Sequence, residues 1–365
     1  MPLIRIQTTE RHAWSGLPLL FPSVPSVLSV IKLFYSMTCL FESSDVERKK
    51  DMAILISAVT RRFCLLLICL RLGIVAQAAD KPSRDLGFTL TPQRQFLKLP
   101  HGFSLAECSA VAVNKKGELF LFHRGPRPIL CFDAEGRFLR AWGDDVLKIP
   151  HGLRVDRDDN VWVTDVGVHR VFKFDPTGKP LLALGTGEPG SANDQFNQPT
   201  DIAFGPKDEV YISDGYGNSR VMEFNQEGRF LKSWGTAGVE RGQFRLPHSI
   251  IVDGEGRVLV GDRENDRIQI FDGDGKWLTT WNGYAPYGMA LDANGRLFVA
   301  DARAHQVLLL DDHGKVRKRW GRQGDEVGEF QAPHMLALDA DGNLYVAEVD
   351  GKRMQKFVRK TTVKP

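Results

Sequence analysis

The sequence predicts an all-β protein built from repeats, because one short phrase of alternating apolar residues returns along the chain. Its six copies are AECSAVAVN (106–114), KIPHGLRVD (148–156), NQPTDIAFG (197–205), RLPHSIIVD (245–253), YAPYGMALD (284–292) and QAPHMLALD (331–339). Aligned on the alternation, successive copies start 39 to 49 residues apart. Short strands that repeat at this period are typical of propeller blades, so we expect a six-bladed β-propeller.

Each repeat contains four predicted strands, which are clearest within residues 150–186. They are HGLRVD (151–156), VWVTD (161–165), HRVFKFD (169–175) and PLLALG (180–185). The turns between them are rich in Asn, Asp and Gly, as tight hairpins require. The same order of strands runs through residues 110–143, 201–235, 249–281, 288–321 and, less completely, 335–360. A β-helix would need shorter coils, and an α-solenoid would need a helical period that the sequence lacks.

The sixth repeat lacks its fourth strand, because only a short tail follows its third strand at residues 354–358. We expect the segment 95–99, from the N-terminal side of the repeats, to supply the missing strand. The ring would then close without an exposed sheet edge. Residues 80–365 are therefore predicted to form one propeller domain.

Residues 1–79 lie outside the repeats and are predicted to be a leader. Arg61 and Arg62 precede an apolar run at 64–75 that Arg71 interrupts, and small residues follow at 76–79. This order is typical of a secretory signal peptide, here at about 52–79, with residues 1–51 an over-extended gene start. We expect export, to the periplasm or outside the cell. A twin-arginine signal and an uncleaved anchor are the alternatives, and such an anchor is the one membrane contact that we expect.

Composition narrows the remaining classes of function. A formal charge of +3 without a run of Lys or Arg gives no basis for nucleic-acid binding, and we expect a monomer. Cys108 and Cys131 are the cysteines beyond the predicted leader. One predicted strand lies between those that carry them, so their backbones would be about 9–10 Å apart. That separation is too large for a disulfide, and we predict two free thiols.

Histidine occupies every second copy of one position in the repeated phrase. The six residues of this column are Ser109, His151, Thr200, His248, Tyr287 and His334. Alternate blades of a six-bladed ring stand about 120° apart, so the three histidines should converge at one end of the channel. Three converging imidazoles are a common way to hold a catalytic zinc with an open fourth position. We therefore predict that His151, His248 and His334 bind zinc; for any one of them alone, a polar residue at the start of a strand is the alternative.

Other polar residues should face the same mouth of the channel. Arg124 and Arg263 occupy equivalent points in blades 1 and 4, and Tyr216 lies one residue further along in blade 3. Two guanidinium groups beside a metal suit an anionic substrate such as a terminal carboxylate. A tyrosine near zinc and arginine would have a lowered pKa and serve as a base. Taken singly, each of these residues is as readily explained as a surface or packing residue, and so are His101, His123, His169, His305 and His313.

The repeats resemble the NHL family, in which an acidic residue, an arginine five or six positions later and a Trp-Gly end recur. The pairs Asp165–Arg170, Asp214–Arg220 and Asp262–Arg267 fit this pattern. Their expected role is structural, because charge-assisted hydrogen bonds between such residues would tie neighbouring blades together.

A second resemblance is more specific. PHGLRVDRDDNVWVTDVGVHRVFKFDP, LGTGEPGSANDQFNQPTDIAF, VYISDGYGNSRVMEF, GQFRLPHSIIV and DRENDRIQIF are similar to the lyase domain of peptidylglycine α-amidating enzymes, over about residues 118–345. That family implies a six-bladed propeller with zinc on His151, His248 and His334. It implies Tyr216 as the catalytic base, and Arg124 and Arg263 as substrate-binding and catalytic arginines. The implied reaction cleaves the N–C bond of a peptidyl-α-hydroxyglycine to give a peptide amide and glyoxylate.

The sequence departs from this family at two places. Gly217 stands where the animal enzymes have a cysteine, so their disulfide is not expected here. Met335 stands where the family has an Asp that helps to hold a structural calcium. Backbone carbonyls at Val111 and Leu153 remain as ligands, and calcium is left open.

Two other classes of function compete with a zinc lyase. The first is a non-enzymatic NHL propeller that binds a protein or a glycan on one face. The second is a metal-dependent propeller hydrolase or lactonase, whose sites usually depend on carboxylate ligands, whereas this column is rich in histidine. We rank the lyase first, and we leave open whether its substrate is a peptide or a small α-hydroxy amide.

Overall fold

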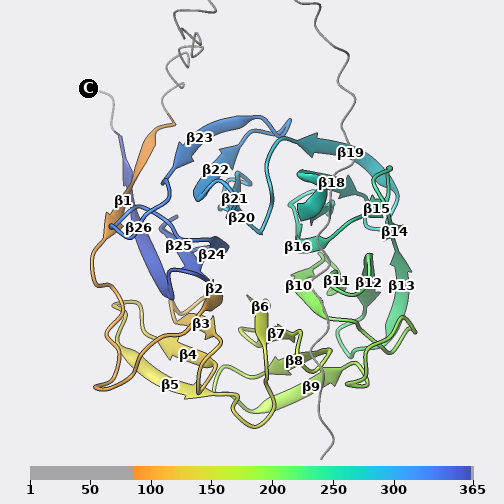
Figure 1. The fold of residues 1–365 in the computed structure, drawn as a ribbon, viewed down its shortest axis with the longest axis horizontal. Helices are drawn as coiled ribbons and strands as arrows, with labels where there is room; N and C mark the ends of the chain where they lie inside the picture. The colour runs from red at the N-terminus through yellow and green to blue at the C-terminus, as the bar shows by residue number, and fades with distance from the viewer. Residues whose placement is uncertain (1–85, 363–365) are drawn as a thin grey trace, which may run out of the picture. The chain divides into compact units, whose positions relative to one another are not determined.

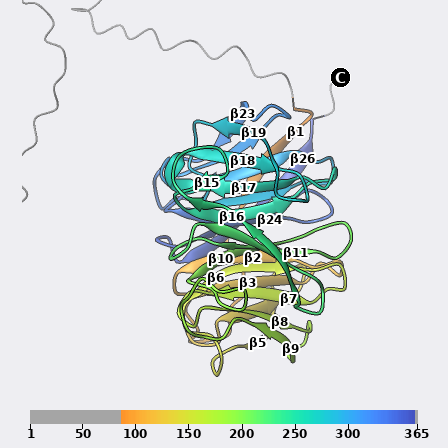
Figure 2. The same ribbon diagram turned by 90° about the vertical axis from the view of Figure 1, so that its right-hand side faces the viewer.

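The computed structural model describes residues 86–362, in which six four-stranded antiparallel sheets stand around a central channel (Figure 1). This arrangement confirms the predicted six-bladed β-propeller. Figure 2 views the ring from the side, and the innermost strands of its blades run along the axis of the ring. Within these residues no helix is long and apolar enough to cross a membrane. The leader predicted at 1–79 lies outside the described residues.

The blades follow one another in chain order, and each runs from its innermost to its outermost strand. Blades 1 and 2 are β2 (Cys108–Val113), β3 (Leu119–His123), β4 (Ile129–Phe132), β5 (Phe138–Trp142) and β6 (Pro150–Val155), β7 (Val161–Asp165), β8 (Arg170–Phe174), β9 (Pro180–Leu184). Blades 3 and 4 are β10 (Pro199–Phe204), β11 (Val210–Asp214), β12 (Arg220–Phe224), β13 (Phe230–Trp234) and β16 (Pro247–Val252), β17 (Val258–Asp262), β18 (Arg267–Phe271), β19 (Trp277–Asn282). Blades 5 and 6 are β20 (Gly288–Leu291), β21 (Leu297–Asp301), β22 (Gln306–Leu310), β23 (Val316–Trp320) and β24 (Pro333–Leu338), β25 (Leu344–Glu348), β26 (Arg353–Thr361), β1 (Phe88–Gln93). A short parallel pair, β14 (Thr236–Ala237) and β15 (Gln243–Phe244), and the 3₁₀ turn η1 (Arg263–Asn265) lie outside these sheets.

The hydrophobic core lies between the blades. In each of the six blades, the second strand is buried along its whole length, because a neighbouring blade covers each of its two faces. Six apolar clusters fill the six interfaces; the one between blades 2 and 3, for example, joins Trp162 and Phe196 to Ile212. This packing fixes the innermost strands, which carry the column residues, at the centre of the ring.

The ring closes through an N-terminal strand, as predicted, but the strand is not the one that the sequence suggested. β1 pairs antiparallel with β26, from Phe88 opposite Thr361 to Gln93 opposite Lys356. The predicted segment 95–99 instead begins with a left-handed residue, Gln95, and makes a single parallel bridge from Lys98 to Arg137. Phe88 and Leu90 alternate with exposed threonines, so their side chains enter the core and favour the earlier segment.

The NHL-type acidic and arginine residues pin the segments that link one blade to the next. Arg220 Nε donates to Asp214 Oδ2 at 3.0 Å, and Arg267 Nε donates to Asp262 Oδ2 at 2.8 Å, as predicted. The third predicted pair does not form, because the Asp165 carboxylate accepts backbone N–H groups of residues 148, 149, 167 and 168. Arg170 donates to the Thr186 carbonyl instead.

Replacing Arg267 by methionine is expected to lower the free energy of unfolding by about 3–5 kcal/mol, because the buried Asp262 carboxylate would lose its charged partner. The guanidinium also donates to carbonyls of Val239, Glu240 and Gln243, which belong to the link between blades 3 and 4. Urea unfolding followed by circular dichroism measures the loss. Arg257→Met, at a half-exposed turn, is the matched control and should cost about 1 kcal/mol or less.

The two cysteines in the described residues are free and buried, as predicted. Cys108 lies in β2 and Cys131 in β4, with β3 between them. Burial raises the pKa of both thiols, that of Cys131 to about 12, so neither is a reactive thiolate at neutral pH.

Candidate metal centre

The column residues lie on irregularities of the innermost strands. In β2, β6, β10, β16 and β24 the pairing with the second strand shifts register at the column residue. A bulge of this kind interrupts the alternation of a strand and redirects one side chain. His151, His248 and His334 are thereby presented to the channel, while the rest of each strand keeps its apolar contacts.

The three histidines meet at one point. Their ring centroids form a nearly equilateral triangle, with separations of 4.7 Å between His151 and His248 and 4.8 Å from each of these to His334. One nitrogen of each ring lies within 4.8 Å of the others, which is close enough for the three to share a metal ion. The structure thus brings together the three residues that the sequence singled out.

A backbone carbonyl of the next blade holds each imidazole. The Nδ1 atoms of His151, His248 and His334 lie 2.7, 2.7 and 2.6 Å from the carbonyl oxygens of Thr200, Tyr287 and Ser109. These acceptors are the three non-histidine members of the column. Since a carbonyl accepts only, each Nδ1 carries the proton and each Nε2 presents its lone pair to the centre. Such a hydrogen bond from the ring nitrogen that does not face the metal orients a metal-binding histidine.

Burial keeps the three histidines neutral. It lowers the pKa of His151 and His248 well below the ordinary value, and the neighbouring histidines of the cluster lower both further. Burial, together with the charges of Arg124 and Arg263, lowers the pKa of His334 to about 3. Neutral imidazole is the form that binds metal ions, so the site is ready for a ligand at neutral pH without first losing protons.

Gly152 controls the position of the carbonyl that holds His151. A Cβ at this glycine would lie 2.5 Å from the Thr200 oxygen and 3.0 Å from the Asp201 Cα, where the innermost strands of blades 2 and 3 pack closely. We expect Gly152→Ala to displace this carbonyl and to weaken metal binding by about 10–100-fold, as loss of an outer-shell partner does. Competition with a metal-indicator dye measures the affinity. Gly254→Ala, where a Cβ meets no atom within 4 Å, is the control; an unchanged affinity in Gly152→Ala would contradict this account.

Tyr216 places its hydroxyl between two of the histidines. The hydroxyl oxygen lies 3.1 Å from Nε2 of both His151 and His248, and Arg263 Nη1 lies 3.4 Å from it. Burial of the hydroxyl raises the pKa of Tyr216, although 37% of the residue is exposed, and the charges of Arg263 and Arg124 oppose that rise. The sequence predicted a lowered pKa for Tyr216; the arginines act in that direction, but burial outweighs them.

Arg263 lies against two aromatic rings at the mouth of the channel. Its guanidinium carbon is 4.6 Å from the ring centre of Tyr287 and 5.6 Å from that of Tyr216, and its Nε donates to Glu264 at 2.8 Å. The Tyr287 ring in turn lies 5.2 Å from His248. Sequence reasoning gave Tyr287 no role, although its place in the column was a signal that pointed to the channel mouth.

Arg124 enters the site from blade 1 at the point equivalent to Arg263. Each of the two follows the last residue of a second strand, and each backbone N–H donates to the residue just before an innermost strand, Glu107 or Leu246. Arg124 Nε donates to the Pro150 carbonyl at 3.3 Å, next to His151. Its positive charge lowers the pKa of His151 and His334 and opposes the rise in the pKa of Tyr216, so it acts on the same cluster as Arg263.

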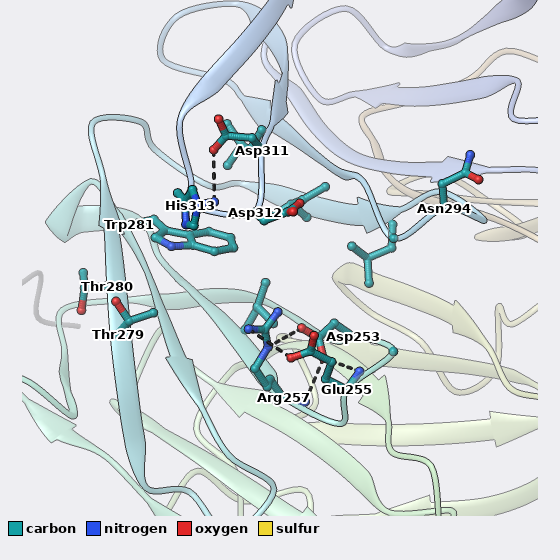
Figure 3. Close-up of a pocket in the computed structure, with 16 residues that line it drawn as sticks. Asp253, Glu255, Arg257, Thr279, Thr280, Trp281, Asn294, Asp311, Asp312 and His313 are labelled. Carbon is teal, nitrogen blue, oxygen red and sulfur yellow. Dashed lines mark hydrogen bonds and ion pairs between the residues drawn. The ribbon is translucent and has the colours of Figure 1, made fainter. Parts of the chain in front are cut away.

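Other histidines and another cavity lie apart from this cluster. His169 and His305 accept backbone N–H groups of Gln198 and Ala332 through Nδ1, and His123 accepts that of Ala106, in agreement with the structural role predicted for them. A cavity of about 800 Å³ lies between blades 4 and 5, at the opposite ends of the strands from the histidines (Figure 3). Its charged residues, among them Asp253 and Arg257, mostly bond within their own turns.

Comparison with known proteins identifies NHL repeats in this chain and shows which proteins have similar sequences. The family model described as NHL repeat matches residues 147–174, 196–224 and 244–271. The chain is 37% identical over 216 residues to the mouse peptidyl-glycine alpha-amidating monooxygenase, which covers 50% of this chain and 22% of that protein. It is 34% identical over 205 residues to the Drosophila melanogaster peptidyl-alpha-hydroxyglycine alpha-amidating lyase 1, covering 46% of this chain and 38% of that protein. The chain thus spans less than half the length of either relative.

Solved structures share the fold at low sequence identity. A streptogramin B lyase structure superposes with a TM-score of 0.56 at 14% identity, over 75% of this chain and 98% of that one. At this identity the likeness concerns the fold alone. The chain is therefore a β-propeller with three matched NHL repeats, and over about half of its length it is similar to proteins named as peptidyl-α-hydroxyglycine α-amidating lyases and monooxygenases.

Proposed function

We propose that this chain is a zinc-dependent lyase that cleaves the N–C bond of peptidyl-α-hydroxyglycine-type substrates to give an amide and glyoxylate. One observation carries the proposal: three neutral imidazoles, each held through Nδ1, converge on one point, and two of them contact a phenol hydroxyl that an arginine also contacts. The sequence similarity to a relative named as such a lyase supports the same reaction.

The donor set suits zinc. His151, His248 and His334 would hold the ion through three neutral nitrogen donors, a set known from catalytic zinc sites that keep a position open. When bound, zinc would supply a Lewis acid that lowers the pKa of the substrate's α-hydroxyl group.

Residues at the channel mouth bind the substrate and transfer the proton. Arg124 and Arg263 bind and orient the carboxylate of the substrate, for which a guanidinium offers paired N–H donors. Tyr216 lies within hydrogen-bond reach of the cluster and, as its tyrosinate, takes the proton of the α-hydroxyl group. The charges of both arginines favour that ionised form, and they offset part of the rise in the pKa of Tyr216 that burial causes.

The proposed reaction balances without a further reactant. The electron pair of the α-hydroxyl O–H bond forms the carbonyl of glyoxylate, while the pair of the N–C bond leaves with the amide nitrogen. The proton taken by Tyr216 returns to that nitrogen, so the enzyme ends in the state in which it began. The substrate is a peptide or a small α-hydroxyglycine amide, and we propose from the pattern at 52–79 that the enzyme acts after export.

Glyoxylate release from a simple N-acyl-α-hydroxyglycine, measured with zinc-loaded protein, tests the function. Release well above the spontaneous rate, at one zinc per chain, is the expected result. Stoichiometric zinc without release would contradict the proposed substrate while leaving the metal site. Folded protein with neither zinc nor release would contradict both, and would favour a propeller that binds a protein or a glycan.

A further inference from the structure

A buried ion pair crosses the central channel below the histidines. Arg154, in β6, donates through Nε to Asp201 Oδ1 at 2.9 Å and through Nη2 to Asp201 Oδ2 at 2.6 Å. The Asp201 side chain is fully buried, and that of Arg154 is 15% exposed. Such a paired, two-bond contact fixes both planar groups in one orientation.

The same two side chains reach four blades. Arg154 Nη2 also donates, at 3.2 Å, to the carbonyl of Met289 in blade 5, which lies opposite blade 2 in the ring (Figure 1). Asp201, in blade 3, accepts the backbone N–H of Ile250 in blade 4 at 3.2 Å and that of Ile202 at 2.8 Å. Nε and Nη2 of Arg154 and both carboxylate oxygens of Asp201 therefore have hydrogen-bond partners, and the pair joins the walls of the channel.

The register along the innermost strands puts this pair at a defined level of the channel. Asp201 comes one residue after the column position of its strand, as Met335 does in blade 6. Met289 comes two residues after it, as Val111 and Leu153 do in blades 1 and 2. These are the levels at which the resemblance to the amidating lyases implies an Asp and two carbonyls around calcium. Arg154 thus bonds to a carbonyl of the level that would face that ion.

The residues present do not fit calcium. Calcium takes six to eight oxygen ligands at about 2.3–2.6 Å, with carboxylates prominent among them. Met335 offers a thioether and packs with Leu153 and Ala110 in an apolar cluster. The Asp201 carboxylate is already engaged by a guanidinium, whose positive charge would repel a second cation at this level.

We propose that the Arg154 guanidinium serves this propeller as the cation of its central channel, so that the chain needs no calcium in order to fold. The positive charge is covalently part of β6, and therefore it does not depend on the concentration of an ion. Asp201 follows Thr200, whose carbonyl holds His151. By fixing Asp201, the ion pair therefore also helps to fix the position of that carbonyl.

Calcium binding to the zinc-loaded full chain tests this directly. After dialysis against millimolar calcium, we expect no stoichiometric calcium by elemental analysis and no change in Tm, since an ion that binds the folded state must raise Tm. One calcium per chain, or a Tm that rises with calcium, would overturn the proposal. Neither readout uses catalysis, so a failure here is distinct from a failure of the proposed lyase activity.

Substitutions of the pair give a second, independent test. Arg154→Leu should lower Tm by roughly 5–15 °C, because it leaves Asp201 buried without its partner. Arg257→Leu, at a half-exposed turn, should change Tm little. Arg154→Leu combined with Met335→Asp should bind calcium and recover part of the lost Tm when calcium is added. A Tm of Arg154→Leu equal to that of the unsubstituted chain would overturn the proposal, and if this variant does not fold, the calcium measurement on the unsubstituted chain still decides.

Discussion

Replacing His248 by alanine is expected to remove the bound metal and the glyoxylate release together, while the propeller stays folded. His248 supplies one of three converging imidazoles, and the other two could not complete a three-nitrogen site. Zinc affinity should fall by more than about 100-fold, the upper range for loss of an outer-shell partner alone. Zinc per chain by elemental analysis, glyoxylate release and circular dichroism give the three readouts.

The control for this variant is His313→Ala, because His313 lies in an exposed turn at the opposite end of its blade. It should keep both zinc and activity. If His248→Ala retained one zinc per chain with unchanged affinity, the three histidines would not be the metal site, and their convergence would be a feature of packing alone.

Tyr216→Phe is expected to lower kcat by about 10²–10⁴-fold, the range for loss of a general acid–base group. Only the hydroxyl is removed, and no backbone contact depends on it among the contacts that the described residues make. Zinc content and Tm should therefore stay unchanged. A large change in KM at constant kcat would instead indicate that the hydroxyl binds substrate and does not move a proton.

Tyr211→Phe is the matched control for that experiment. From blade 3, its hydroxyl donates at 3.3 Å to the carbonyl of Gly273 in blade 4, at the far ends of the strands from the histidines. The same chemical change there should leave kcat as it is. A comparable loss in both variants would trace the effect to stability and would remove the reason for assigning proton transfer to Tyr216.

The sequence predicted the blades and the convergence of the histidines because both depend on a period. Apolar alternation marks strands, and a position repeated in every second blade points to one axis, whatever the local detail. The bulges at His151, His248 and His334 were not predictable, because a bulge is a relation between two strands and leaves no residue type of its own. The carbonyls that hold the imidazoles were missed for the same reason, since any residue supplies a carbonyl.

The contacts that cross the ring were harder to predict from the sequence. Arg154 and Asp201 are 47 residues apart, and no other copy of the repeated phrase has an Arg or an Asp at their positions, so the repeat gave no sign of their pairing. The closing strand was assigned to 95–99, although Phe88 and Leu90 carry the alternation that the core selects. A prediction of that pairing needs the partner strand, which lies at the other end of the chain.

The pairing of β1 with β26 has a consequence for the order in which the molecule assembles. Five blades consist of strands that are consecutive in the chain, so each needs only local segments to form its sheet. The sixth joins Phe88 to Thr361, and closing so long a loop is slow because it costs chain entropy before it gains contacts. During synthesis β1 is therefore made long before its partner, and its backbone hydrogen-bonding groups stay unpaired until β26 has been made. A chain that ended before β26 would keep that edge, and we expect it to aggregate and not to form a smaller ring.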